Sequence, residues 1–210
     1  MVSYDYIFDP LCGWCFGASP LIEVLVEHCH QHQIKLNFHP AGMFTRQALP
    51  TAYRAHIIAA DQRIAMLTGQ EFGASYLARL QADKPIIMDS QLTCQAIIAA
   101  PQLGLNAELM LHAIQRGHYQ LGLDVSDNNT LASLAAQLGV NAADWQHAMA
   151  NARNILPEAL TTTKALMSRH LLQGYPSLLQ TKHQQSQAVA LSTFYGAPEA
   201  WRAWLEAELS

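Results

Sequence analysis

The sequence predicts an α/β fold in which a large all-helical insertion divides the α/β part of the chain into two pieces. Three observations predict this fold: a strand–helix–strand pattern near the start, a stretch from about 45 to 154 almost without strand signals, and two short strands between helices near the end. The 210 residues can bury a core without disulfides or metals. We therefore predict one discontinuous domain at 1–44 and 155–210, and an inserted helical domain at 45–154.

The first piece begins with a short strand at Ser3–Phe8, where Tyr, Ile and Phe precede an Asp-Pro breaker. A helix is expected over Trp14–His32 because its apolar residues recur at helical spacing. Pro20 lies within this helix and is expected to kink it. Residues 34–38 then alternate between apolar and polar types, which is typical of a strand. If the two strands are parallel neighbours, the three elements form a βαβ unit.

The middle of the chain is rich in Ala, Leu, Gln and Ile, and it reads as a series of helices separated by Gly and Pro. Residues suited to helix N-caps, such as Ser90 and Asn141, stand at several of the expected starts. The expected helices lie at 50–66, 73–82, 90–102, 106–119, 128–138 and 142–152.

The last piece is expected to begin with a separate helix from Pro157 to about His170. Two short strands, Ser177–Gln180 and Gln187–Leu191, are expected to form a hairpin through the polar run between them. A final helix over Pro198–Leu209 carries two tryptophans and a leucine on one face.

Composition excludes several classes of protein. Charged residues make up 13% and hydrophobic residues 50% of the chain, which excludes an intrinsically disordered protein. A net charge of −4 provides no basic surface for nucleic acid. The start resembles no secretory signal, and no apolar run is long enough to span a membrane, so we expect a cytoplasmic protein. Glycine-rich nucleotide motifs are absent from the sequence.

The sequence Cys-Gly-Trp-Cys at Cys12–Cys15 lies where the first strand meets the first helix. Unpaired N–H groups at a helix start favour a thiolate, so Cys12 is the candidate nucleophile. Cys15 lies one turn further and can attack a mixed disulfide formed on Cys12. Two alternatives remain open: half of a zinc site, although no second ligand pair is evident, and two inert buried thiols.

Residues 9–15, Asp-Pro-Leu-Cys-Gly-Trp-Cys, resemble the active-site segment of the cytoplasmic DsbA-like proteins, a group of predicted protein-disulfide isomerases. The resemblance covers nearly the whole chain. It continues through His-Tyr at 118–119, Gly-Leu-Asp-Val-Ser-Asp at 122–127, Leu-Gly-Val at 138–140 and Gly-Tyr-Pro at 174–176.

This resemblance implies a thioredoxin fold with a large helical insertion, and a cis proline at Pro176 facing the cysteine pair. It further implies that Tyr175 and Pro176 position a substrate disulfide over Cys12, with Gly13 and Trp14 beside it. This sequence differs from the strongly oxidising periplasmic relatives at Trp14, where those proteins carry histidine. Because tryptophan has no charge to stabilise a thiolate, we expect a less oxidising pair.

The remaining reactive side chains have simpler interpretations. Asp9 is a candidate either for a proton relay to Cys15 or for a cap of the turn before the helix. Cys29 and Cys94 are interpreted as inert buried thiols. The cluster of histidines at 28–32 suits the helix dipole, and without an evident fourth ligand in the sequence we predict no metal site.

We therefore predict a thiol–disulfide oxidoreductase, a reductase or isomerase, that needs no cofactor beyond its cysteine pair. Its substrates are expected to be protein or small-molecule disulfides, with glutathione or thioredoxin as the electron partner. One alternative is a glutathione-dependent enzyme of the kappa-class transferase or hydroxychromene-carboxylate isomerase type. A second alternative is a non-catalytic peptide-binding or chaperone module. The sequence leaves the oligomeric state open.

Overall fold

The computed structural model describes residues 2–209, and its centre is a four-stranded sheet in the order β2-β1-β5-β6. The strands are β1 (Ser3–Phe8), β2 (Lys35–Pro40), β5 (Ser177–Lys182) and β6 (Gln185–Val189). Strands β1 and β2 pair in parallel, with Ser3 opposite Lys35, which confirms the predicted βαβ unit. Strand β5 pairs antiparallel with β1, and β6 continues the sheet as a hairpin.

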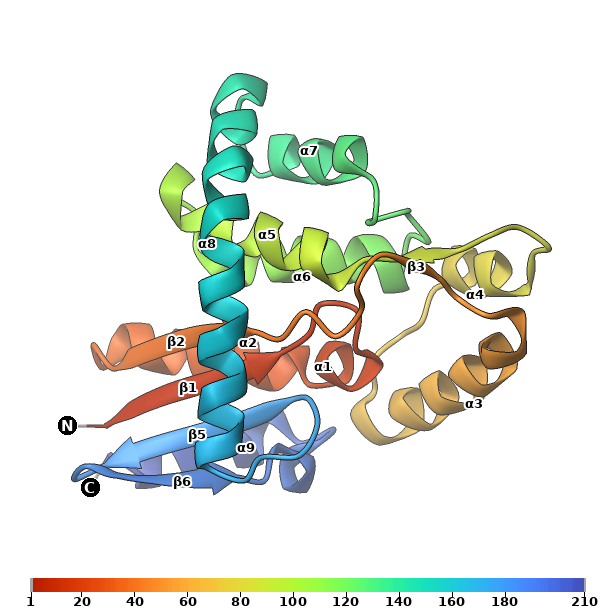
Figure 1. Cartoon of the computed structure of the whole chain (residues 1–210). Helices are drawn as coiled ribbons and strands as arrows, with labels where there is room; N and C mark the ends of the chain where they lie inside the picture. Colours follow the sequence, from red (N-terminus) through yellow and green to blue (C-terminus); the bar gives the residue numbers. More distant parts are fainter. Residues whose placement is uncertain (1, 210) are drawn as a thin grey trace.

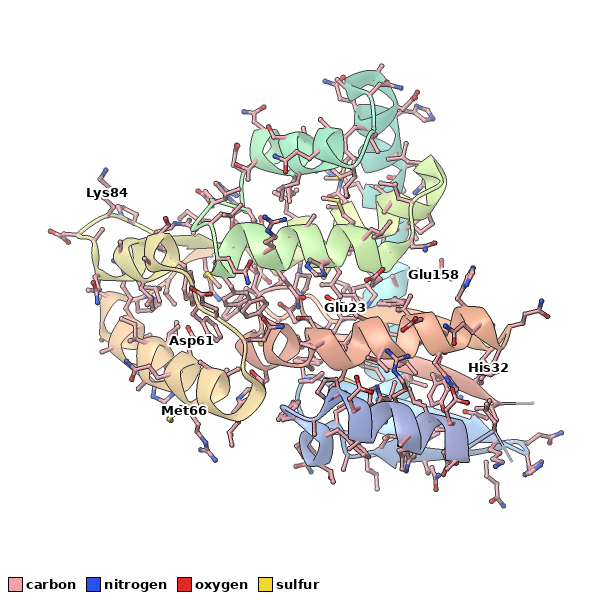
Figure 2. The ribbon with its side chains drawn as sticks, turned by 180° about the vertical axis from the view of Figure 1, so that it is seen from behind. Glu23, His32, Asp61, Met66, Lys84 and Glu158 are labelled. Atoms are coloured by element: carbon pink, nitrogen blue, oxygen red, sulfur yellow. The ribbon has the colours of Figure 1, made fainter. Side chains whose placement is uncertain are left out.

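Helices cover both faces of this sheet (Figures 1 and 2). Helices α2 (Ser19–Gln31) and α9 (Pro198–Ala207) lie side by side on one face, and α8 (Ala142–Arg169) crosses the other. The side chain of Thr163 on α8 donates a hydrogen bond of 2.7 Å to the carbonyl of Pro40 in β2. No helix in residues 2–209 is both long and apolar enough to cross a membrane.

The expected single helix over residues 14–32 is wrong, because the structure has two helices there, α1 (Gly13–Gly17) and α2. The break lies at Ala18, and Ser19 Oγ donates a hydrogen bond of 2.8 Å to the carbonyl of Phe16. Pro20 therefore lies in the first turn of α2, where its missing N–H leaves no intrahelical bond unmade. Pro20 begins a helix instead of kinking one.

A series of helices occupies the chain between β2 and β5, as predicted. Their bounds lie close to those expected from the sequence, with a 3-10 turn, η1, completing the expected helix at 90–102. The helices before α8 are α3 (Thr51–Thr68), α4 (Ala74–Gln81), α5 (Ser90–Ala99), η1 (Ala100–Leu103), α6 (Ala107–Tyr119) and α7 (Asn128–Gln137).

Helix α8 is continuous, so the expected separate helices at 142–152 and from Pro157 to about 170 are wrong. Pro157 lies inside α8, although it forfeits a backbone hydrogen bond there. Buried side chains on both sides of the proline, including Trp145, Leu156 and Thr163, hold the two halves in line. The predicted boundary between 154 and 155 falls within this continuous helix.

The structure also contains a small second sheet that the sequence did not predict. Strands β3 (Gln47–Ala48) and β4 (Ile87–Met88) pair antiparallel at the base of α3 and α4. Two-residue strands are too short to display an alternating pattern, so periodicity could not find them.

The core is continuous between the sheet and the inserted helices. Tyr6 and Phe8 of β1 belong to the same buried hydrophobic cluster as Ile97 of α5 and Met110 of α6. Trp201 of α9 belongs to the same cluster and is fully buried. The Trp201 indole N–H donates a hydrogen bond of 2.8 Å to the Leu21 carbonyl in α2.

We predict that Trp201→Phe lowers the free energy of unfolding by roughly 1–3 kcal/mol, because it removes a buried hydrogen bond and part of the core. Denaturant unfolding measures the change. Trp204→Phe is the matched control, since Trp204 stacks on Trp201 at the half-buried surface. If both variants lose the same free energy of unfolding, the hydrogen bond from Trp201 to the Leu21 carbonyl does not contribute the stability that we assign to it.

Candidate active site

Cys12 lies at the N-cap of α1, where the chain turns from the end of β1 into the helix. Its backbone is extended, and its carbonyl accepts hydrogen bonds from the N–H groups of Cys15, at 3.0 Å, and Phe16, at 3.1 Å. Cys12 is half-buried, whereas Cys15 is fully buried behind it. Of the two neighbouring cysteines, Cys12 is therefore the one that a second molecule can reach.

The two thiols have opposite pKa shifts. The pKa of Cys12 is lowered, chiefly by a hydrogen bond from the Cys15 thiol and further by the backbone N–H groups of Cys15 and Trp14. Burial raises the pKa of Cys15 well above the ordinary thiol value. The structure therefore favours a thiolate on Cys12 and a protonated thiol on Cys15.

The Tyr175–Pro176 peptide bond is cis, as the family resemblance implied. It immediately precedes β5, and the Tyr175 carbonyl lies 3.6 Å from Cys12 Sγ, which donates a hydrogen bond to it when Cys12 is protonated. The structure thus brings together two segments that are 163 positions apart in the chain.

Gly13 and Trp14 lie between the two cysteines, in the first turn of α1, and we refer to residues 12–15 as the cysteine loop. Trp14 is half-buried, and its ring stacks on Tyr195 at a centroid distance of 5.7 Å. A Cβ on Gly13 would lie 2.9 Å from Asp61 Oδ1 and 3.0 Å from Ile64 Cδ1. Glycine therefore permits the close approach of α3 to the cysteine loop.

Asp9 lies completely buried beneath the loop. Its carboxylate accepts hydrogen bonds from Leu11 N at 2.9 Å, Met43 N at 2.6 Å and Ser90 Oγ at 2.7 Å. Its backbone N–H points to Cys15 Sγ at 3.5 Å. The bond to Leu11 N caps the turn before α1, which is one of the two roles expected from the sequence. Burial raises the pKa of the Asp9 carboxyl.

A cavity of about 200 Å³ opens beside Cys12. Its walls are mainly apolar and come from the cysteine loop, α3, α4, α6 and the β3–β4 region. Asp61 of α3 lies in this cavity and is only 4% exposed. Its Oδ2 accepts a hydrogen bond of 2.8 Å from Tyr76. Burial raises the pKa of Asp61 to about 6.

The histidines expected to stabilise the end of α2 lie far along that helix from the cysteine loop (Figure 2). Glu206 of α9 lies beside them, a contact that the sequence did not predict: it pairs with His28 at 3.1 Å and His32 at 3.4 Å. The donor atoms of the three residues lie within 4.8 Å of one another. Cys29 and Cys94 are buried, and burial raises the pKa of both thiols.

Comparison with known proteins decides the family. A model of the DSBA-like thioredoxin domain matches residues 5–196. The chain belongs to this DsbA-like family. The match confirms the predicted thioredoxin fold with its helical insertion and makes the chain an enzyme of the dithiol–disulfide oxidoreductase class. No curated protein sequence matches the chain significantly.

Solved structures of similar proteins agree with this DsbA-like assignment. The cytosolic disulfide reductase DsbM from Pseudomonas aeruginosa is 33% identical, with a TM-score of 0.89 over 99% of this chain and 98% of its own. The same protein with GSH matches equally well. A proposed protein disulfide isomerase from Nitrosomonas europaea is 22% identical, with a TM-score of 0.77 over 99% and 97%. A 2-hydroxychromene-2-carboxylate isomerase shares the fold at 14% identity and TM-score 0.57, over 99% and 98%.

Sequence reasoning missed Asp61, Tyr76 and Tyr195 in this DsbA-like site. A signal existed for Asp61, because it shares a helical face with Ile64 and Thr68, both of which are buried. A carboxylate on a buried face of a helix calls for a partner or a function. Tyr195 left no comparable signal, since its contact with Trp14 depends on how the end of the chain folds back.

We predict that Cys15→Ala raises the pKa of Cys12 towards the ordinary thiol value, because the hydrogen bond from Cys15 is its largest stabilising contact. Cys15→Ser is the matched control, since its hydroxyl still donates to the Cys12 thiolate and should preserve most of the lowered pKa. Thiolate absorbance as a function of pH measures both variants. Identical titration curves would show that the hydrogen bond does not set this pKa.

Proposed function

We propose that this DsbA-like protein is a disulfide reductase or isomerase that acts through the dithiol of Cys12 and Cys15. The observation that carries the proposal is the asymmetry of the pair: Cys12 is reachable and has a lowered pKa, while Cys15 is buried and protonated beside it. A nucleophilic thiolate with a protected second thiol is what thiol–disulfide exchange requires.

In the proposed reaction the Cys12 thiolate attacks one sulfur of a substrate disulfide. An S–S bond forms between Cys12 and that sulfur, and the other half of the substrate leaves as a thiolate. Cys15 then loses its proton and attacks Cys12 Sγ, which releases the second half of the substrate as a thiol. The two cysteines lose two electrons and the one proton of Cys15; the substrate disulfide gains both electrons, and the proton passes to the half that leaves as a thiol.

Tyr175, Pro176, Gly13 and Trp14 are the proposed substrate-positioning residues. The Tyr175 carbonyl lies 3.6 Å from Cys12 Sγ, so an extended peptide that pairs with this backbone would bring a disulfide to the nucleophile. Trp14, two residues after Cys12, and Tyr195 present a stacked, half-buried aromatic surface. Asp9 is proposed as the proton acceptor for Cys15, because its carboxylate acts electrostatically on that thiol and burial raises the pKa of the carboxyl.

Glutathione is the electron partner that we propose for regenerating the dithiol. The support is the similarity to DsbM, a cytosolic reductase whose structure contains GSH. We also propose a cytoplasmic location, because DsbM is cytosolic. The proposed steps use no metal or organic cofactor. A glutathione transferase or isomerase would need Cys12 alone, whereas the hydrogen-bonded position of Cys15 supports the two-cysteine reaction.

A trapping experiment tests the proposed roles. We expect Cys15→Ser to accumulate mixed disulfides through Cys12 when mixed with oxidised glutathione, because the resolving thiol is gone. Mass spectrometry of the non-reduced protein measures the adduct. The Cys12→Ser variant should form no adduct. The Cys29→Ala variant should still reduce disulfides, since Cys29 is buried and is not part of the pair. Full disulfide reductase activity in Cys12→Ser would refute the proposal.

The reduction potential provides a second test. Trp14 places no positive charge beside the Cys12 thiolate, so the reduced form gains less stabilisation than in a strong oxidase. We expect a potential nearer to the thioredoxin value of about −270 mV than to the DsbA value of about −120 mV. Equilibration with glutathione redox buffers measures it, and a value close to that of DsbA would contradict the reductase assignment.

A further inference from the structure

The cavity beside Cys12 contains an acidic side chain that the proposed dithiol reaction does not use. Apolar side chains supply most of the cavity surface, among them Leu49, Ile57, Ile64 and Leu80. Asp61 lies among them on the side of α3 that faces α1 and α4 (Figure 2). A substrate that occupies this cavity while Cys12 attacks its disulfide would therefore contact a carboxylate.

The two carboxylate oxygens of Asp61 have different neighbours. Tyr76 of α4 donates a hydrogen bond of 2.8 Å to Oδ2. The other oxygen, Oδ1, faces Gly13, because it lies 2.9 Å from the place where a Cβ on that glycine would stand. Gly13 is next to Cys12 in the chain, so the carboxylate lies beside the residue that carries the nucleophile. No hydrogen bond to Oδ1 occurs among residues 2–209.

The charge of Asp61 has no protein counterion within the described chain. Arg79 lines the same cavity, but it pairs with Asp124 at 3.1 Å and donates to the Leu123 carbonyl. His118 is fully buried, and burial lowers its pKa to about 3, so it is neutral. His56, the other basic residue of the cavity wall, forms no ion pair with Asp61.

An uncompensated carboxylate in an apolar cavity is costly, and a cation that enters with a ligand would relieve the cost. With a pKa of about 6, Asp61 is largely ionised at pH 7.5 and is available to such a cation. Tyr76 and Tyr119 also face this part of the cavity, and both are neutral phenols at that pH because burial raises their pKa values.

We propose that Asp61 selects small-molecule disulfides whose halves carry a protonated amine, by binding the ammonium group while Cys12 attacks the sulfur. This inference rests on the proposed dithiol function and adds the substrate class to it. The ammonium group would donate a hydrogen bond to Oδ1, and the carbon chain between nitrogen and sulfur would lie against the apolar wall. Asp61 acts here as a specificity residue, and the exchange chemistry stays with the two cysteines.

The test compares two disulfides of nearly equal size, cystamine and bis(2-hydroxyethyl) disulfide, which differ by the charge of their end groups. Reduced wild-type protein is mixed with each at pH 7.5, and the rate of formation of the Cys12–Cys15 disulfide is measured. In each reaction two protein thiols are oxidised and one disulfide is reduced to two thiols. Free glutathione is reacted with the same two disulfides as a reference. The ratio of the cystamine rate to the bis(2-hydroxyethyl) disulfide rate for the protein is divided by the same ratio for glutathione.

We expect wild-type protein to prefer cystamine roughly tenfold or more beyond the glutathione reference, the factor typical of a hydrogen bond between charged groups. Asp61→Asn keeps the hydrogen bond from Tyr76 and should reduce this preference to the reference ratio. Asp83→Asn is the matched control, because Asp83 is exposed and lies outside the cavity, and it should behave like wild type.

The outcomes separate the two proposals. If wild-type protein reacts with both disulfides but prefers cystamine no more than free glutathione does, the assignment of Asp61 is overturned and the dithiol function stands. This measurement uses wild-type protein alone, so it decides the matter even where Asp61→Asn does not fold. If Asp61→Asn slows both disulfides equally, Asp61 does not select by charge. If reduced wild-type protein reacts with neither disulfide, the dithiol function itself fails.

Discussion

A single buried carboxylate, that of Asp9, joins the three chain segments that meet at the cysteine pair. It binds the turn before α1 through Leu11 N, the chain leaving β2 through Met43 N, and the start of α5 through Ser90 Oγ. These segments belong to the βαβ unit and to the inserted helices, so one side chain connects the sheet to the insertion. Because Asp9 is completely buried, water cannot replace any of these bonds without opening the core. The position of Cys12 relative to the helical layer depends on this junction.

The inserted helices supply what a minimal dithiol loop lacks, which is an enclosed surface beside the nucleophile. Helix α3 approaches the loop closely because Gly13 and Gly17 have no side chains: a Cβ on Gly17 would lie 2.6 Å from Ile64 Cγ2. Buried Arg54 then holds the far end of α3 by donating to the carbonyls of Ala82 and Lys84. The cavity is thus bounded by close packing at one end of α3 and by charged hydrogen bonds at the other, which suits a site that binds small ligands.

Local patterns in the sequence were sufficient for the features that depend on short stretches: the βαβ unit, most helices, the terminal hairpin and the Cys-x-x-Cys loop. Features that depend on tertiary packing could not be predicted. Pro157 indicates a helix end by itself, and only buried contacts on both sides keep α8 continuous. The contact of Glu206 with His28 joins residues 178 positions apart, so no local pattern announces it. Asp61 is intermediate, because its place on a buried helix face was readable while its proximity to Gly13 was not.

The pairing of β1 with β5 has a consequence for the order in which the protein is made. Ser3 lies opposite Thr181, so the first strand cannot find this partner until nearly the whole chain has left the ribosome. The parallel β1–β2 pair and the inserted helices have contacts nearer in sequence, so their partners are available earlier during synthesis. The edge of β1 that β5 covers has no partner strand until β5 is made. Translation pauses or chaperones that act on the nascent chain would therefore influence this protein most strongly at the stage just before residues 177–189 emerge.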